Sequence, residues 1–282
     1  MYPYDFEPSN KGINQEDIFV VMPLAEKYKD VFNILIKNAT SQVAARRGIT
    51  LKAFRSDLDP RTMSGWIQVL EHLYPAQIVL GVLTEETNAN VFYELGIAHA
   101  TQPLSRQVLI GEKAYAPRFD TKDLIFMRYD PANVAASIDE LALRIETALD
   151  TWKYESELLI RRAIARLSPF DFEFVMAWGH VAHFAVTTSG DGPENYRKIL
   201  ESQHGGDKDY MEGVFKRHCE AMARLGQIGL IGLDTRTEGK TVYFSNHWTD
   251  LGNLVLIEFG IIEQEERRRR FKDMPKAIRS FR

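Results

Sequence analysis

The chain has 282 residues, 45% hydrophobic and 26% charged, which is typical of a globular protein with one large or two ordinary domains. Its single cysteine, Cys219, excludes an internal disulfide and a cysteine-based zinc site, and no apolar run approaches the roughly 18 residues that span a bilayer. Residues 1–14 lack the basic start and apolar core of a signal peptide, so we expect a cytoplasmic protein without membrane contact or a metal site.

The formal net charge of −4 is unevenly distributed. Residues 1–155 hold 16 basic and 21 acidic side chains, whereas residues 264–282 hold 8 basic and 3 acidic side chains. The first half therefore offers no general attraction for nucleic acid, while the C-terminal segment could provide one.

Short apolar runs alternate with stretches of helical spacing in the first half of the chain. The predicted strands are 17–22, 49–54, 76–83, 106–110 and 123–129, and the predicted helices are 25–45, 62–74, 88–101 and 132–153. This alternation implies βαβ units, and the near-continuous apolar runs imply strands that are covered on both faces. We therefore expect an α/β fold, a flavodoxin-like doubly wound five-stranded parallel sheet over residues 16–153, preceded by an N-terminal extension at 1–15.

The second half changes character. Helices are predicted at 156–167, 169–187, 195–203, 210–225 and 249–260, with an apolar segment at 226–231, a hairpin tip at 235–240 and a strand at 241–244. Helices followed by a two-stranded ribbon and a closing helix are the components of a winged helix. We expect residues 156–282 to form a mainly helical, winged-helix-like domain with a basic tail.

Glu94 is the most prominent candidate for chemistry. The pattern places it in the first turn of a helix directly after a buried strand, where ligands bind in open α/β sheets. The positive end of the helix favours an ionised carboxylate, which beside Phe92 and Tyr93 could stabilise or attack the oxocarbenium-like centre of a breaking glycosidic bond. The alternative is that Glu94 only complements the helix dipole, although it lies four residues after Asn90 rather than the three of a capping box.

Other strand ends supply residues for the same crevice. Met22, Pro23 and Leu24 follow the first strand and could contact a base or phosphate through their backbone. Arg55 could pair with phosphate, Asp57 could hold ribose hydroxyls, and Ser64 lies at a helix start that could bind an anion. The alternative for Asp57 and Ser64 is ordinary turn chemistry. Neither GxGxxG nor GxxxxGK[ST] occurs, so dinucleotide-binding and P-loop folds lack their motifs.

Three segments together carry a family resemblance: Asp-Ile-Phe-Val-Val-Met-Pro at 17–23, Arg-Ser-Asp at 55–57 and Asn-Val-Phe-Tyr-Glu-Leu-Gly-Ile-Ala-His-Ala at 90–100. Over residues 16–130 the chain resembles the nucleoside 2-deoxyribosyltransferase-like families, part of a wider group that includes TIR-like nucleotide hydrolases. In that family the matching glutamate attacks the anomeric carbon and forms a covalent glycosyl intermediate. The resemblance implies that Glu94 is the nucleophile and that Asn88, Asn90 and Tyr93 lie in the substrate site.

The chain departs from the transferases at Asn88, where they usually carry a carboxylate that contacts the base. The resemblance is therefore as compatible with hydrolysis as with transfer. It implies an N-glycosidase that cleaves the base–sugar bond of a nucleotide or NAD, with that molecule as substrate and no cofactor required. Related enzymes often complete their sites across subunits, so we expect a homo-oligomer.

The order of the two predicted domains is similar to toxin-like effectors of bacterial anti-phage systems, including retron-linked ones, that a nucleic-acid or reverse-transcriptase partner holds in check. The alternatives are a nucleotide-sensing DNA-binding regulator without catalysis and a scaffold for complex assembly. Candidate contacts to a nucleic acid or ribonucleoprotein partner are basic side chains of the second half, namely Arg217, Arg224, Arg236, Lys240, Arg267, Arg268, Arg269 and Arg270. Their alternative is a solvated face or, for the last four, a helix end or flexible tail.

Overall fold

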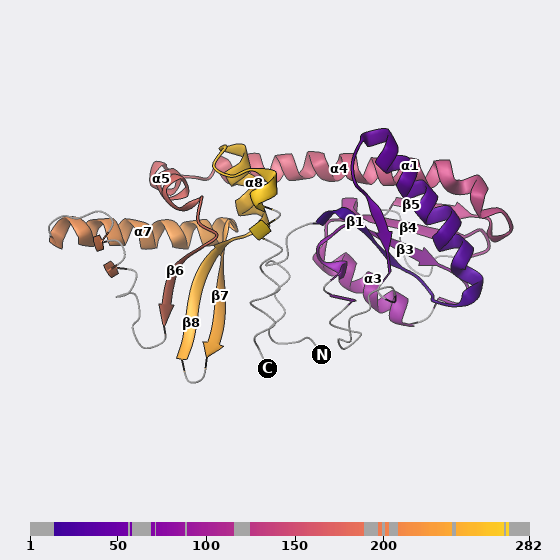
Figure 1. Ribbon diagram of the computed structural model, residues 1–282, viewed down its shortest axis with the longest axis horizontal. Coiled ribbons are helices and arrows are strands. Elements are labelled where there is room, and N and C mark those ends of the chain that lie inside the picture. The colour runs from indigo at the N-terminus through magenta and orange to yellow at the C-terminus, as the bar shows by residue number, and fades with distance from the viewer. Residues whose placement is uncertain are drawn as a thin grey trace. The chain divides into compact units, whose positions relative to one another are not determined.

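The computed structural model describes residues 14–55, 57, 69–70, 72–87, 89–115, 125–188, 197–198, 201–202, 208–238, 241–267 and 269–270. They form two compact units that divide between Ser156 and Glu157 (Figure 1). The division falls inside the long helix α4 (Ile138–Ile164).

The first unit is built on a five-stranded, all-parallel sheet with the order β2-β1-β3-β4-β5, which confirms the expected α/β, flavodoxin-like class (Figure 1). The strands are β1 (Asn14–Val21), β2 (Lys52–Phe54), β3 (Ala76–Leu83), β4 (Gln107–Glu112) and β5 (Ile125–Tyr129). Because β2 and β3 lie on opposite sides of β1, the strand order reverses there, and the carboxyl ends of these strands form the switch point at which such folds bind ligands.

The core of this unit follows the alternation of side chains along the strands. Ile78, Leu80 and Val82 of β3 belong to one buried cluster, together with residues of β1, β4, β5 and the helices after β1 and β5. All eight residues of β3 are buried, which explains why its apolar run predicts its two ends without error. The intervening Gly81 points to the opposite face of the sheet.

The helical segment after β1 contains a turn that the sequence did not predict. It comprises η2 (Glu26–Tyr28), the π-helical η3 (Val31–Ile36) and α1 (Lys37–Arg47). Its buried residues repeat every fourth position, at Val31, Phe32, Leu35, Ile36, Ala39, Thr40 and Val43. This period exceeds the 3.6 residues of an α-helix, and the wider π turn keeps the stripe on the sheet. Ile34 lies outside this stripe and is 37% exposed.

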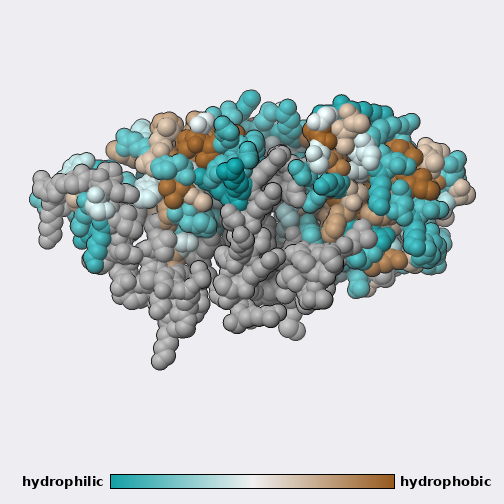
Figure 2. All heavy atoms as spheres, in the orientation of Figure 1, coloured by the Kyte–Doolittle hydropathy of each residue, from teal (hydrophilic) through white to brown (hydrophobic). Residues whose placement is uncertain are grey.

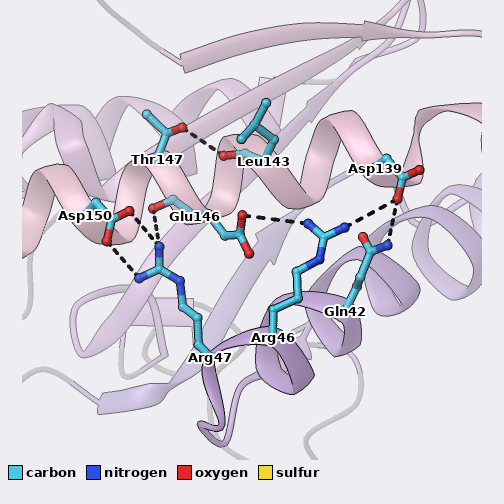
Figure 3. Close-up of polar contacts among 8 residues, drawn as sticks. All are labelled: Gln42, Arg46, Arg47, Asp139, Leu143, Glu146, Thr147 and Asp150. Atoms are coloured by element: carbon cyan, nitrogen blue, oxygen red, sulfur yellow. Dashed lines mark hydrogen bonds and ion pairs between the residues drawn. The ribbon is translucent and has the colours of Figure 1, made fainter.

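Polar contacts join α1 to α4 on the outside of the sheet (Figure 3). The Arg47 guanidinium donates to both carboxylate oxygens of Asp150, at 2.9 and 2.7 Å, and to the carbonyl of Glu146. Arg46 lies 3.8 Å from the carboxylates of Asp139 and Glu146. Because these groups are partly solvated, each pair stabilises the fold by about 1 kcal/mol or less.

The remaining helices of the first unit follow the prediction with one exception. α3 (Ala89–Thr101) occupies the predicted place, and η5 (Leu104–Arg106) and η6 (Pro131–Ser137) precede β4 and α4. The predicted break between 153 and 156 is wrong, because α4 continues to Ile164; no Gly or Pro interrupts residues 138–164. The helix predicted at 62–74 lies mostly outside the described residues.

The second unit contains a three-stranded antiparallel sheet with the order β6-β8-β7 (Figure 1). Its elements are α5 (Pro169–Trp178), β6 (His183–Thr188), α7 (Lys208–Ile228), β7 (Ile231–Glu238), β8 (Thr241–Trp248) and α8 (Asp250–Glu258). A helix, a strand, a long helix and an antiparallel ribbon are thus present in this order. The winged-helix identity of this unit stays a prediction.

Two expectations for the second unit are wrong. The helix predicted at 169–187 ends at Trp178, and 183–188 form β6, where the β-branched run Val-Thr-Thr favours a strand. The tip predicted at 235–240 is shorter, because Thr235 to Glu238 pair with Phe244 to Thr241 as ordinary ladder residues.

A buried carboxylate connects α5 to α7. Asp171 has no exposed surface; it forms a capping box with Ser168 and accepts a 2.9 Å hydrogen bond from Nε of Arg224. Both oxygens of this buried acid are therefore satisfied within the unit, which is the condition for a buried charge to be tolerated.

We expect Asp171→Ala to lower the free energy of unfolding by about 2–4 kcal/mol, because it removes a helix cap and one partner of a buried ion pair. Urea denaturation measures this change. Glu220→Gln is the matched control, since Glu220 is exposed and lies 4.0 Å from the same arginine; it should change stability by less than about 0.5 kcal/mol. Equal effects of the two substitutions would contradict the assignment of Asp171 as a helix cap and a partner in a buried ion pair.

Candidate active site

Two loops meet at the switch point between β1 and β3. After β3, the backbone N–H of Thr84 donates to Oγ1 of Thr87 at 2.6 Å, and the N–H of Thr87 donates to the carbonyl of Thr84 at 3.0 Å. After β1, Nζ of Lys27 lies 2.5 Å from a carboxylate oxygen of Glu86. The turn that leads into α3 is thus stabilised by its own hydrogen bonds and by an ion pair with the loop after β1.

Gly81 lets α3 approach the sheet closely. A Cβ at this position would lie 2.7 Å from Cδ2 of Leu95 and 2.6 Å from Cδ2 of Leu109, so a side chain would displace both. Val91 and Ala98 are buried on the same face of α3 as Leu95. Because Leu95 directly follows Glu94, this contact constrains the backbone of α3 at Glu94. A glycine inside an apolar strand is the sequence signal that could have indicated the close approach.

Glu94 lies deeper in α3 than the sequence suggested. The helix begins at Ala89, so the expected position in the first turn is wrong and Glu94 is in the second turn. At a rise of 1.5 Å per residue it lies about 7 Å from the helix start, beyond most of the influence of the helix dipole. Burial raises the pKa of Glu94 from its ordinary value of 4.5 to about 7. Burial thus raises the pKa, against our expectation that the helix start favours the ionised form.

The Glu94 carboxyl has no hydrogen bond or ion pair with any residue that the structure describes. A partly buried acid without a partner among the described residues costs stability, and such groups cluster at functional sites. With a pKa of about 7, both its protonated and its ionised forms are populated at neutral pH, so it can attack as a carboxylate or donate a proton as an acid.

A second cluster lies at the carboxyl ends of β1 and β2. The Arg55 guanidinium donates to both oxygens of Asp57, from Nε at 2.9 Å and from Nη2 at 2.6 Å. It stacks over the ring of Phe32 at 4.6 Å, and its Nη1 lies 3.9 Å from Sδ of Met22. The structure thus brings together Met22, Arg55 and Asp57, which the sequence placed in one crevice. Phe32 was missed, because its position in a predicted helix gave no sign that it lies beside Arg55.

The cluster corrects the role expected for Arg55. Its side chain is only 12% exposed and two of its nitrogens are engaged by Asp57, so it does not present an open fork to a phosphate. Of the other predicted site residues, Pro23 is buried, whereas Leu24, Asn90 and Tyr93 are exposed. Ser64 and Asn88 lie outside the described residues.

The basic residues of the second half divide into structural and exposed groups. Arg224 pairs with buried Asp171, which gives it a structural role, while its side chain is 39% exposed and its role in partner binding stays a prediction. Arg217 is exposed on α7. Arg236 lies on β7, where its side chain is outside the described set, and Lys240 and Arg268 lie outside the described residues.

The C-terminal arginines are not a uniform basic tail. Arg267 is 3% exposed and donates to Oδ1 of Asp250 at 2.6 Å. Arg270 is 7% exposed and donates to the carbonyl of Gly179 at 2.9 Å and to Oδ1 of buried Asn253 at 3.2 Å. The partner-binding role expected for these two is corrected, because their guanidinium groups hold the C-terminal segment against α5 and α8. Arg269 remains exposed beside Glu265.

Comparison of the sequence with protein-family models and with curated proteins finds no match. Among the described residues, no helix combines the length and apolarity needed to cross a bilayer. Within the same residues, no group of three or more His, Cys, Asp or Glu side chains is arranged to hold a metal ion.

We expect Glu94→Gln to stabilise the protein at alkaline pH. The folded-state pKa of about 7 exceeds the unfolded value near 4.5, so the folded state binds more protons between these values and the stability of the wild type falls as pH rises through that window. Since glutamine does not ionise, the variant should gain about 1–2 kcal/mol over the wild type between pH 5 and pH 8, a figure reduced from about 2.5 kcal/mol for residual solvent contact.

Urea unfolding at both pH values measures the difference. Glu85→Gln is the matched control, because Glu85 is exposed in the turn before α3. If the stability difference between the Glu94 variant and the wild type does not change with pH, the account of Glu94 burial is wrong.

We expect Arg267→Ala and Arg270→Ala each to lower the free energy of unfolding by about 2–4 kcal/mol, because Arg270→Ala leaves buried acceptors without a donor and Arg267→Ala removes the buried partner of the half-buried Asp250. Arg269→Ala, in the same segment, should cost less than about 0.5 kcal/mol. Thermal or urea unfolding of the three variants distinguishes them. Similar small effects at all three positions would restore the view of a solvated basic tail.

Proposed function

We propose that the first unit cleaves the base–sugar bond of a nucleotide or NAD and that Glu94 is the reacting carboxyl. The single observation that carries this proposal is a mostly buried carboxyl, without a described protein partner, beside the switch point of a doubly wound sheet. The resemblance of residues 90–100 to the nucleoside 2-deoxyribosyltransferase-like families supports the same bond type and the same residue.

In the proposed first step, an oxygen of ionised Glu94 bonds to the anomeric carbon, and the bond from that carbon to the base nitrogen breaks. The electron pair leaves with the base, which takes up a proton when it departs from a neutral nucleotide and needs none when it departs as nicotinamide from the pyridinium ring of NAD. Water then attacks the anomeric carbon, releasing the sugar and restoring the carboxylate, with loss of one proton to solvent. Transfer to a second base begins with the same step, so the asparagine at residue 88 bears on the choice of base and on transfer versus hydrolysis rather than on the bond that is cleaved.

The surroundings of Glu94 favour the transition state over the ground state. The carboxylate is partly desolvated and has no positive partner among the residues that the structure describes, which raises its free energy. Positive charge develops at the anomeric carbon as the glycosidic bond breaks, and a poorly solvated carboxylate interacts strongly with it. An interaction that strengthens during the reaction lowers the barrier.

We propose that the second unit controls this activity by binding a partner, as in toxin-like anti-phage effectors. The surface over α5 includes hydrophobic residues (Figure 2), and Phe170, Phe172 and Met176 of this helix are 52%, 43% and 49% exposed. The exposed face of α7 carries charges of both signs. With three of the expected arginines engaged within the unit, these features support a protein or ribonucleoprotein partner more than bare DNA. Homo-oligomer formation is part of the proposal.

We expect the purified chain to release a free base from NAD or from a nucleoside monophosphate, and Glu94→Gln to reduce that rate by at least about 10³-fold, because the variant lacks the nucleophile. Chromatography with mass spectrometry measures the base and the sugar product. For the wild type, kcat/KM should rise with pH through about 7, since the ionised form attacks.

Glu85→Gln is the matched control, as it removes an exposed carboxylate of the turn before α3 without removing the nucleophile. Base release that survives Glu94→Gln would show that another group reacts. Tight nucleotide binding by the wild type with no product would favour the non-catalytic regulator.

A further inference from the structure

The Arg55–Asp57 pair lies at the carboxyl edge of β1 and β2, where two hydrogen bonds join its side chains. We propose that Asp57 binds the vicinal hydroxyls of a ribose and that Arg55 is its positioning residue, so that the site takes ribosyl rather than 2′-deoxyribosyl substrates. This inference rests on the proposed function, because it names the sugar of the bond that Glu94 would cleave.

From the strand order, we place the Asp57 and Glu94 carboxyls on the two sides of the end of β1. Asp57 follows β2, Glu94 lies in the helix after β3, and β1 runs between these strands. Neighbouring strands are about 4.8 Å apart, so the carboxyl ends of β2 and β3 are separated by about 10 Å. A pentose with one carboxyl group on each side fits that width. Glu94 would then face the anomeric carbon C1′, while Asp57 accepts hydrogen bonds from the hydroxyls on C2′ and C3′.

The geometry of Asp57 suits a diol. An ionised carboxylate accepts about four hydrogen bonds, and Arg55 occupies one position on each oxygen. The Asp57 side chain is 32% exposed, against 12% for Arg55, so the remaining acceptor positions are open to a ligand. The 2′- and 3′-hydroxyls of ribose supply two donors for two oxygens. A 2′-deoxyribose supplies one, which leaves one charge-assisted hydrogen bond unmade.

Arg55 fixes the direction in which Asp57 presents these oxygens. Its two parallel hydrogen bonds set the plane of the carboxylate, and its stacking on Phe32 sets the plane of the guanidinium. A lysine at this position offers a point charge and cannot reproduce either constraint. Arg55→Lys therefore tests orientation while keeping the charge.

The test compares matched ribonucleoside and 2′-deoxyribonucleoside 5′-monophosphates for each of four bases, using the full chain. We expect the wild type to favour the ribo form in kcat/KM by about 10- to 100-fold, the effect of one hydrogen bond to a charged group. Asp57→Asn should reduce this ratio to near one, and Arg55→Lys should reduce it by about 3- to 10-fold. Asp150→Asn, which breaks a similar bidentate arginine pair elsewhere in the unit, should leave the ratio unchanged.

Equilibrium binding of AMP and dAMP to Glu94→Gln provides a readout that needs no turnover. We expect AMP to bind about 10- to 100-fold more tightly, and Asp57→Asn in the same background to remove the difference. A ribose preference in binding without any base release by the wild type would refute the proposed function and leave ribose recognition standing. Three results would overturn this inference. They are base release without a ribose preference, an equal loss of kcat/KM for ribo and deoxyribo substrates in Asp57→Asn, and the absence of binding of both AMP and dAMP.

Discussion

The structure of the candidate site depends on one constraint, the burial of the Glu94 carboxyl without a described partner. Burial raises its pKa to about 7, so ionisation of this group near neutral pH opposes folding. A glutamine would avoid this cost, and an arginine or lysine nearby would offset it. The close contact of Leu95 with Gly81 and the threonine turn before α3 hold the acid in place despite the cost. Such a balance is typical of a site in which the missing partner arrives with a ligand.

The parts of the fold that the sequence predicted are those governed by local rules. β3 is an uninterrupted apolar run between polar residues, and it begins and ends where the pattern indicates. β6 was predicted as helix, because six residues give too few periods to separate a strand from a helix end. The π turn of η3 was not predicted, since it arises from packing a four-residue repeat against the sheet. α4 was divided in two, although nothing in its sequence stops it.

In the candidate site, too, the features governed by local rules were predicted, whereas those that depend on contacts between segments were not. Met22, Arg55 and Asp57 were predicted correctly as neighbours because parallel strands end at one edge of the sheet. What Arg55 contacts depends on side chains from three segments, and the sequence assigned it to a phosphate. Arg267 and Arg270 illustrate the same limit: four consecutive arginines suggest a solvated run, yet two of those described are buried against acceptors contributed by α5 and α8. Net charge in a segment does not determine which of its charges face solvent.

The pKa of Glu94 tests the account most directly. Carbon-13 NMR of protein labelled in the glutamate carboxyl groups, with Glu94→Gln to assign the resonance, follows the titration of this one residue. The account predicts a midpoint near pH 7, well above the ordinary value of 4.5. A midpoint near 4.5 would mean that the carboxyl is solvated or paired, and it would contradict the burial on which the proposed role of Glu94 depends.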